Sequence, residues 1–115
     1  MNAILKTATE RRDLPRQRTL LRGRVLYGEN ASISVDCTIR NLNAKGALLL
    51  VPDDQPLPAE FTLMDVTEGI SFEAHLIWRR ANMVGVTLGD RHDLKSVVEA
   101  QLRSLREIWM ALAPR

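Results

Sequence analysis

The sequence contains few of the side chains from which metal centres, disulfides and nucleophilic sites are usually built. Its 115 residues include one cysteine, Cys37, and two histidines, His75 and His92. A single cysteine excludes an intrachain disulfide and agrees with a reducing compartment. Because these three residues have no recognisable ligand spacing, we expect no metal site and no cofactor.

Long apolar runs are also missing. The first apolar stretch, Ala3-Ile4-Leu5, is too short for the core of a signal peptide, and no later run is long enough to cross a membrane. The sequence has no nucleophile elbow with a Ser–His–Asp set and no GxxxxGK phosphate loop. We therefore expect a cytoplasmic protein that has no membrane span and is not an enzyme.

Aromatic residues are scarce, with two Trp, one Tyr and two Phe, and they form no run suited to stacking successive bases. The hydrophobic share of 45% and the charged share of 26% are ordinary for a globular domain. The charge is unevenly distributed, because residues 1–24 hold seven of the 16 basic residues and only two of the 14 acidic ones. This basic start predicts an anionic partner, and the lack of aromatics argues against a nucleic acid.

Residues 1–17 are expected to form a flexible arm, since they are polar and basic, lack a sustained period and contain Pro15. Residues 18–115 are expected to form the folded domain. Strand-forming residues separated by turn signals predict six short strands in it. They cover roughly residues 19–27, 33–39, 47–51, 61–65, 70–78 and 83–88, the last two as a hairpin.

Alternation within these strands predicts which side chains are buried. Cys37 falls on the apolar phase of its strand, so we expect a core residue and not a reactive thiol. Trp78 continues the apolar phase of Phe72, Ala74 and Leu76, and His75 falls on the opposite face. We expect His75 to be a solvated or partly buried structural histidine.

The period changes near the C-terminus, where apolar residues recur at spacings of three and four. This predicts an amphipathic helix over about residues 91–112, with Asp90 or Asp93 as its N-cap. We expect its apolar face to pack on the strands rather than on a partner. Six short strands and one C-terminal helix predict a mainly β protein, a small antiparallel barrel with a helix packed against it.

Two groups of residues are candidates for binding. Arg11, Arg12 and Arg16 form an arginine cluster with the spacing RxxxR at its core. A guanidinium group binds phosphate oxygens in pairs, contacts guanine edges and stacks on bases. The cluster alone also suits a solvated basic tail or a nucleic-acid tether. Arg18, Arg22 and Arg24 lie beyond it and could extend the anion site, but we expect them on a solvated strand face.

The second group is the segment Asn41-Leu42-Asn43-Ala44-Lys45-Gly46, which joins two predicted strands. The amides of Asn41 and Asn43 offer donors and acceptors near a turn. Gly46 would allow a positive φ or the close approach of a ligand. Alone, the segment is equally an ordinary hairpin turn.

Taken together, the two groups resemble the motifs of the PilZ family. RxxxR at Arg12 and Arg16 is followed, 24 residues after Arg16, by a strand and a segment similar to [D/N]xSxxG. The later HLIWRR segment and the VGV segment that returns from it are similar to that family's later hairpin. The resemblance covers about residues 10–90.

The resemblance implies a six-stranded antiparallel β-barrel that binds cyclic di-GMP, often as an intercalated dimer. It implies that Arg12 and Arg16 hold phosphate and guanine groups, and that Arg11 is an additional arginine of the site. Asn41 would read a guanine edge, and Gly46 matches the motif glycine. The arm would fold across the barrel when the ligand binds. Asn43 departs from the pattern, because the family usually has serine there.

Two functions follow from this comparison. The first is a cyclic di-GMP receptor made of this domain, which signals through a downstream protein partner that the sequence does not name. The second is a degenerate PilZ-like adaptor, in which Asn43 has abolished nucleotide binding and only protein contacts remain. In both cases we expect a monomer or a weak dimer.

Overall fold

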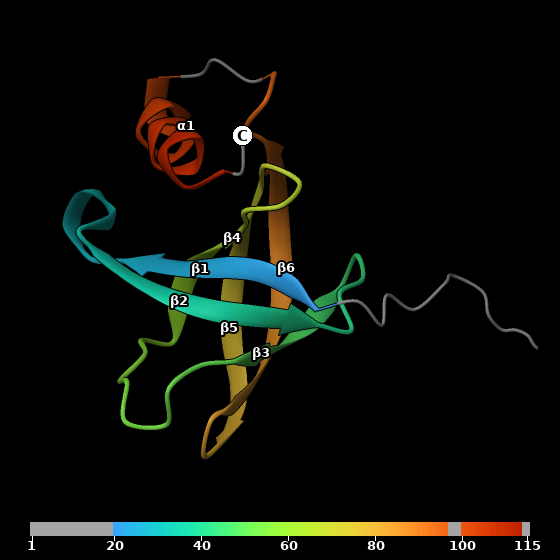
Figure 1. The fold of residues 1–115 in the computed structure, drawn as a ribbon. Coiled ribbons are helices and arrows are strands. Elements are labelled where there is room, and N and C mark those ends of the chain that lie inside the picture. The colour runs from blue at the N-terminus through green and yellow to red at the C-terminus, as the bar shows by residue number, and fades with distance from the viewer. Residues whose placement is uncertain (1–19, 97–99, 114–115) are drawn as a thin grey trace, which may run out of the picture.

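The computed structural model describes residues 20–96 and 100–113, which form a closed six-stranded antiparallel barrel with one C-terminal helix (Figure 1). The strand order around the barrel is β1-β2-β3-β6-β5-β4, and pairing of β4 with β1 closes it. The predicted fold class is confirmed. The elements are β1 Leu21–Tyr27, β2 Ile33–Arg40, β3 Gly46–Leu50, β4 Glu60–Asp65, β5 Ile70–Arg80, β6 Met83–Asp93 and α1 Ala100–Leu112, with a short 3-10 turn over Glu29–Ala31.

The alternation of β2 shows how the interior is filled. Val35, Cys37 and Ile39 are buried, whereas Asp36 between them is exposed. The inward side chains of the other strands meet them, so that one apolar cluster fills the barrel from end to end. The largest of its fully buried members are Ile39, Leu49 and Leu63.

The C-terminal helix packs on the outside of the barrel, as predicted. Ile108, Trp109 and Leu112 cover a second apolar cluster that includes the outward residues Leu26 and Met64. The indole Nε1 of Trp109 donates a hydrogen bond of 2.8 Å to the carbonyl of Val66. None of the described helical residues forms a segment long and apolar enough to span a membrane.

The predicted start of the helix is wrong, because residues 91–93 belong to β6. Strand β6 runs to Asp93, which pairs with Ile70, and the amide of Leu94 then donates to the carbonyl of Gly69 at 2.8 Å. The described part of α1 begins at Ala100. Asp93 accepts a hydrogen bond from the amide of Lys95 at 2.9 Å, so its carboxylate shapes the turn after β6.

Candidate ligand-binding site

The segment from Asn41 to Lys45 connects β2 to β3, at the end of the barrel where β1 begins (Figure 1). Leu21, the first residue of β1, pairs with Ile39 near the end of β2. Arg16 is five residues before Leu21. Five residues of extended chain span at most about 18 Å. The topology therefore places this connection within reach of the arginine motif. Arg11, Arg12 and Arg16 themselves lie outside the described residues.

Asn43 organises the connection through its side chain. Its Oδ1 accepts hydrogen bonds from the amides of Lys45, at 2.8 Å, and Gly46, at 3.1 Å. Its own amide donates to the carbonyl of Gly46 at 3.0 Å. This is an Asx-type turn, which a serine hydroxyl also forms, though more weakly. The departure from the motif serine thus retains an acceptor that closes the turn.

The glycine of the motif is required by packing against the neighbouring strand. A Cβ at Gly46 would lie 2.7 Å from the carbonyl oxygen of Val86 on β6. The interpretation that Gly46 supplies a positive φ is wrong. The residue of this segment with a positive φ is Asn41, at 52°. Asparagine is among the few residues that adopt this left-handed conformation readily. In this conformation Asn41 lies on the exposed surface.

Trp78 was predicted on the buried phase of β5, and this prediction is wrong. Leu76 pairs with Val86 and Trp78 pairs with Gly85, so Ile77 is one extra residue in β5. This bulge turns Trp78 to the outer face, where its side chain is 44% exposed. Its indole lies directly over Gly85, where a Cβ would collide with the ring.

The exposed indole lies near the motif connection. Gly85 pairs with Leu48, which is two positions along β3 from Gly46. Leu48 itself is half-buried. Sequence reasoning missed Trp78 as a surface residue. Its outward position follows from the extra residue Ile77 in the pairing with β6, and no local signal in the sequence reveals that residue.

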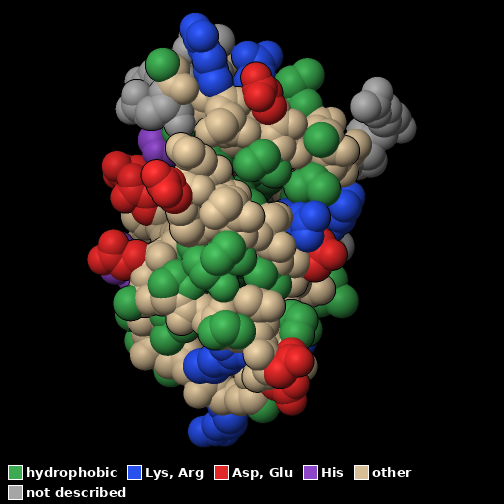
Figure 2. Space-filling view, turned by 90° about the vertical axis from the view of Figure 1, so that its left-hand side faces the viewer, with side chains coloured by type: hydrophobic (Ala, Val, Ile, Leu, Met, Phe, Trp, Pro, Cys, Tyr) green, Lys and Arg blue, Asp and Glu red, His purple; other side chains and the backbone are tan. Residues whose placement is uncertain are grey.

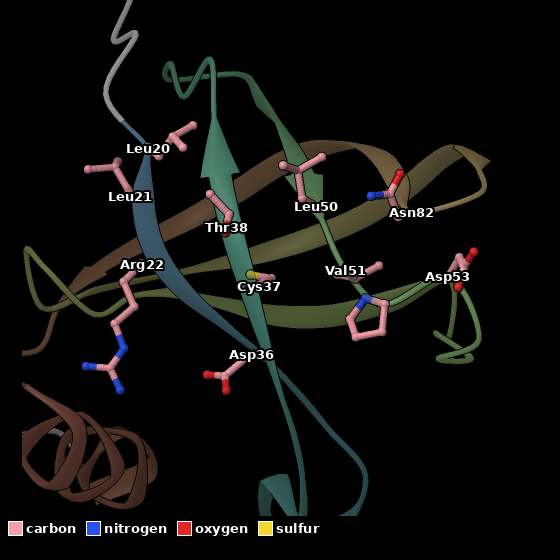
Figure 3. Close-up of a pocket in the computed structure, with 11 residues that line it drawn as sticks. Leu20, Leu21, Arg22, Asp36, Cys37, Thr38, Leu50, Val51, Asp53 and Asn82 are labelled. Carbon is pink, nitrogen blue, oxygen red and sulfur yellow. The ribbon is translucent and has the colours of Figure 1, made fainter.

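An open pocket of about 850 Å³ lies on the outer face of β1, β2 and β3 (Figure 3). It extends from Leu20, where the described chain begins, across β2 to the turn between β5 and β6. Its volume lies within the range typical of small-molecule sites. Its lining residues are Leu20, Leu21, Arg22, Asp36, Cys37, Thr38, Leu50, Val51, Pro52, Asp53 and Asn82.

The pocket offers little free positive charge. Arg22 donates to the carbonyl of Leu112 at the end of α1, at 2.8 Å, and Arg24 beside the pocket forms a 2.8 Å ion pair with Asp36. Arg22 and Arg24, which were expected on a solvated strand face, are therefore engaged in contacts with the protein, and Arg18 lies outside the described residues. Asp36 and Asp53 add negative charge to the lining. Cations for an anionic ligand must come from outside this pocket.

Three titratable side chains outside the motif connection lie apart from one another. Burial raises the pKa of the Cys37 thiol to about 12, so the predicted core cysteine stays protonated. His75 is half-exposed, as predicted, and its Nε2 lies 3.3 Å from a carboxylate oxygen of Glu60. The buried Asp65 accepts a hydrogen bond from the amide of Glu68, and burial raises the pKa of its carboxyl group. These three groups belong to separate parts of the structure.

Comparison with known families gives one match. The family model described as the PilZ domain matches residues 10–106, which is most of the chain and includes both motifs. Neither the curated proteins nor the solved structures gave a significant match.

Proposed function

The chain belongs to the PilZ domain family of cyclic di-GMP-binding receptor and adaptor domains, and we propose that it is itself a receptor for cyclic di-GMP. The observation that carries the proposal is the Asn43 turn. Asn43 is the one departure from the family motif, and its Oδ1 closes the connection on which the rest of the motif depends. As the receptor of a bacterial second messenger, the protein is proposed to act in the cytoplasm.

The distribution of charge supports a site shared between the barrel and the residues before it. Cyclic di-GMP carries two phosphates, whereas the described pocket is lined by one arginine and two aspartates. We assign the phosphates and guanine faces to Arg12 and Arg16, with Arg11 beside them. Their guanidinium groups form charge-assisted hydrogen bonds, each of which is worth about 1.5–3 kcal/mol.

The barrel surface supplies groups that read bases. Asn41 presents an exposed amide at a fixed backbone position, which suits paired hydrogen bonds to a guanine edge. Trp78 adds an exposed indole on the same side of the barrel as the β3 residues that follow Gly46. Stacking of a base on an aromatic ring contributes about 1–3 kcal/mol. We therefore add Trp78 to the proposed site.

The second candidate function is an adaptor that acts without the nucleotide. The observation that favours it is the apolar surface at the β5 bulge, where Ile77 is 59% and Trp78 is 44% exposed. Adjacent exposed apolar side chains suit a protein partner. In this function the Asn43 turn only shapes the connection between β2 and β3.

Calorimetric titration of the full chain with cyclic di-GMP separates the two functions. The receptor predicts saturable binding that Arg12→Ala/Arg16→Ala abolishes and that GTP does not reproduce. Arg103→Ala is the matched control, because Arg103 is an exposed arginine of α1, and it should bind as the wild type does. If the folded wild type gives no binding heat and Asn43→Ser gains it, the receptor proposal fails and the adaptor stands.

A further inference from the structure

A second group of side chains with binding chemistry lies on the opposite end of the β5–β6 pair from Trp78. Phe72 pairs with Arg91 and Ala74 with Leu88, so Glu73 faces both Gly89 and Asp90. This second bulge, now in β6, brings Asp90 and His92 to the face occupied by Glu73. Figure 2 shows acidic and histidine side chains gathered along one edge of the molecule.

The geometry suits one shared ion. A carboxylate oxygen from each of Glu73 and Asp90 and a ring nitrogen of His92 all lie within 4.8 Å of one another. In a tetrahedral Zn²⁺ site the ligands lie about 2.0–2.2 Å from the metal, and two ligand atoms are therefore about 3.3–3.6 Å from each other. Binding one ion would require the three side chains to rotate toward one another.

The carboxylates of the group take part in no ion pair between described residues. Ion pairs between described residues join Arg24 to Asp36, His75 to Glu60 and Lys95 to Asp93, and none of them includes Glu73 or Asp90. Two carboxylates this close repel each other, and a divalent cation removes that repulsion. The imidazole favours a transition metal such as zinc over magnesium or calcium, which prefer oxygen ligands alone.

An independent feature lies directly beside the group. Ser71 is opposite His92 in the strand register, so that their Cβ atoms are about 4.5–5.5 Å apart on the same face. Ser71 is 1% exposed, and its hydroxyl has no hydrogen-bond partner among the described residues. Buried hydroxyls without a partner are uncommon, and a water or an ion is one kind of neighbour that satisfies them. A hydroxyl can also accept a hydrogen bond from the ring N–H of a metal-bound histidine, as second-layer groups do.

We propose that Glu73, Asp90 and His92 bind one zinc ion, with water completing its coordination, and that Ser71 supports the site from beneath. The ion joins β5 to β6 just before β6 ends. The next residue, Leu94, is fully buried in the cluster that holds α1. Zinc would therefore fasten the end of the barrel that carries the helix. This proposal departs from the sequence-based expectation of no metal site.

The test uses the full chain without a histidine tag, stripped of metal by chelation. Competition with a chromophoric chelator should show one saturable Zn²⁺ site, and Co²⁺ should give visible absorption bands. The thermal unfolding midpoint should rise with Zn²⁺ concentration. Loss of a ligand in His92→Gln or Asp90→Asn should weaken the apparent affinity by at least about tenfold.

His75→Gln is the matched control, because it removes the other surface histidine, which also lies beside a carboxylate. It should bind Zn²⁺ as the wild type does. The proposal is overturned if the wild type shows no saturable site, or if His92→Gln binds zinc unchanged. It is equally overturned if His75→Gln loses as much affinity as His92→Gln.

Discussion

Replacing Gly46 with alanine tests whether the motif glycine serves packing against β6. The new Cβ would lie 2.7 Å from the carbonyl oxygen of Val86, and both atoms belong to paired backbones. Neither side can move without disturbing the β3–β6 ladder. Forcing a group into such a space costs about 1–3 kcal/mol. A domain of this size loses about 4 °C of melting temperature per kcal/mol, so the midpoint should fall by roughly 4–12 °C.

Gly89→Ala is the control for this prediction. Its Cβ would meet Glu73 at 3.6 Å and beyond, which is ordinary contact, and its φ is outside the left-handed region. Alanine there should be neutral or should stabilise by up to about 1 kcal/mol through the unfolded chain. Both variants are unfolded thermally in metal-free buffer and followed by circular dichroism. Equal midpoints for Gly46→Ala and Gly89→Ala would refute the packing role of Gly46.

Three further substitutions or conditions give direct outcomes. Asn43→Ser should keep the turn and cyclic di-GMP binding, whereas Asn43→Ala, which loses both Oδ1 hydrogen bonds, should bind roughly tenfold more weakly in the same calorimetric titration. Trp78→Ala should weaken the free energy of cyclic di-GMP binding by about 1–3 kcal/mol, and Trp78→Phe should weaken it less. Neither variant should change the melting temperature by more than a few degrees. Unchanged binding in Trp78→Ala would remove the indole from the site. Burial raises the pKa of Cys37 from 9.0 to about 12, so the unfolded thiol loses its proton first. The thiol's contribution to stability should therefore be complete below pH 9 and should decline as the pH rises from 9 towards 12, which denaturant titrations at several pH values measure.

The local pattern of the sequence was enough to predict most of the barrel. Strand β2 alternates from Val35 onward, and Val35, Cys37 and Ile39 are buried as the alternation predicted. Ile33 lies on the same phase and was also predicted to be buried, but it is 42% exposed at the start of the strand. The C-terminal end of the helix at Leu112 was predicted correctly, because the apolar spacing continues to that residue. Its start was wrong because residues 91–93 gain hydrogen bonds from the distant residues 70–72, which no local period reveals.

The site could be predicted only where it depends on neighbouring residues. The Asn43 turn is local, and the short amides together with Gly46 indicated it. The outward position of Trp78 depends on one extra residue in β5, and a shift of one residue moves a side chain to the other face of a strand. The cluster of Glu73, Asp90 and His92 depends on the pairing register between two strands, so its members look unrelated along the sequence.

The outward position of Trp78 and the cluster of Glu73, Asp90 and His92 both arise in the last hairpin, which is long. Strands β5 and β6 each have 11 residues, more than any other strand of the barrel. Bulges bend a strand and increase its local twist, which helps a long strand pair to join a closed barrel. One bulge turns Trp78 outward beside the motif connection, and the other brings Asp90 and His92 to Glu73. The two irregularities therefore place Trp78 on one surface and Glu73, Asp90 and His92 together on another, where regular alternation would have left other side chains.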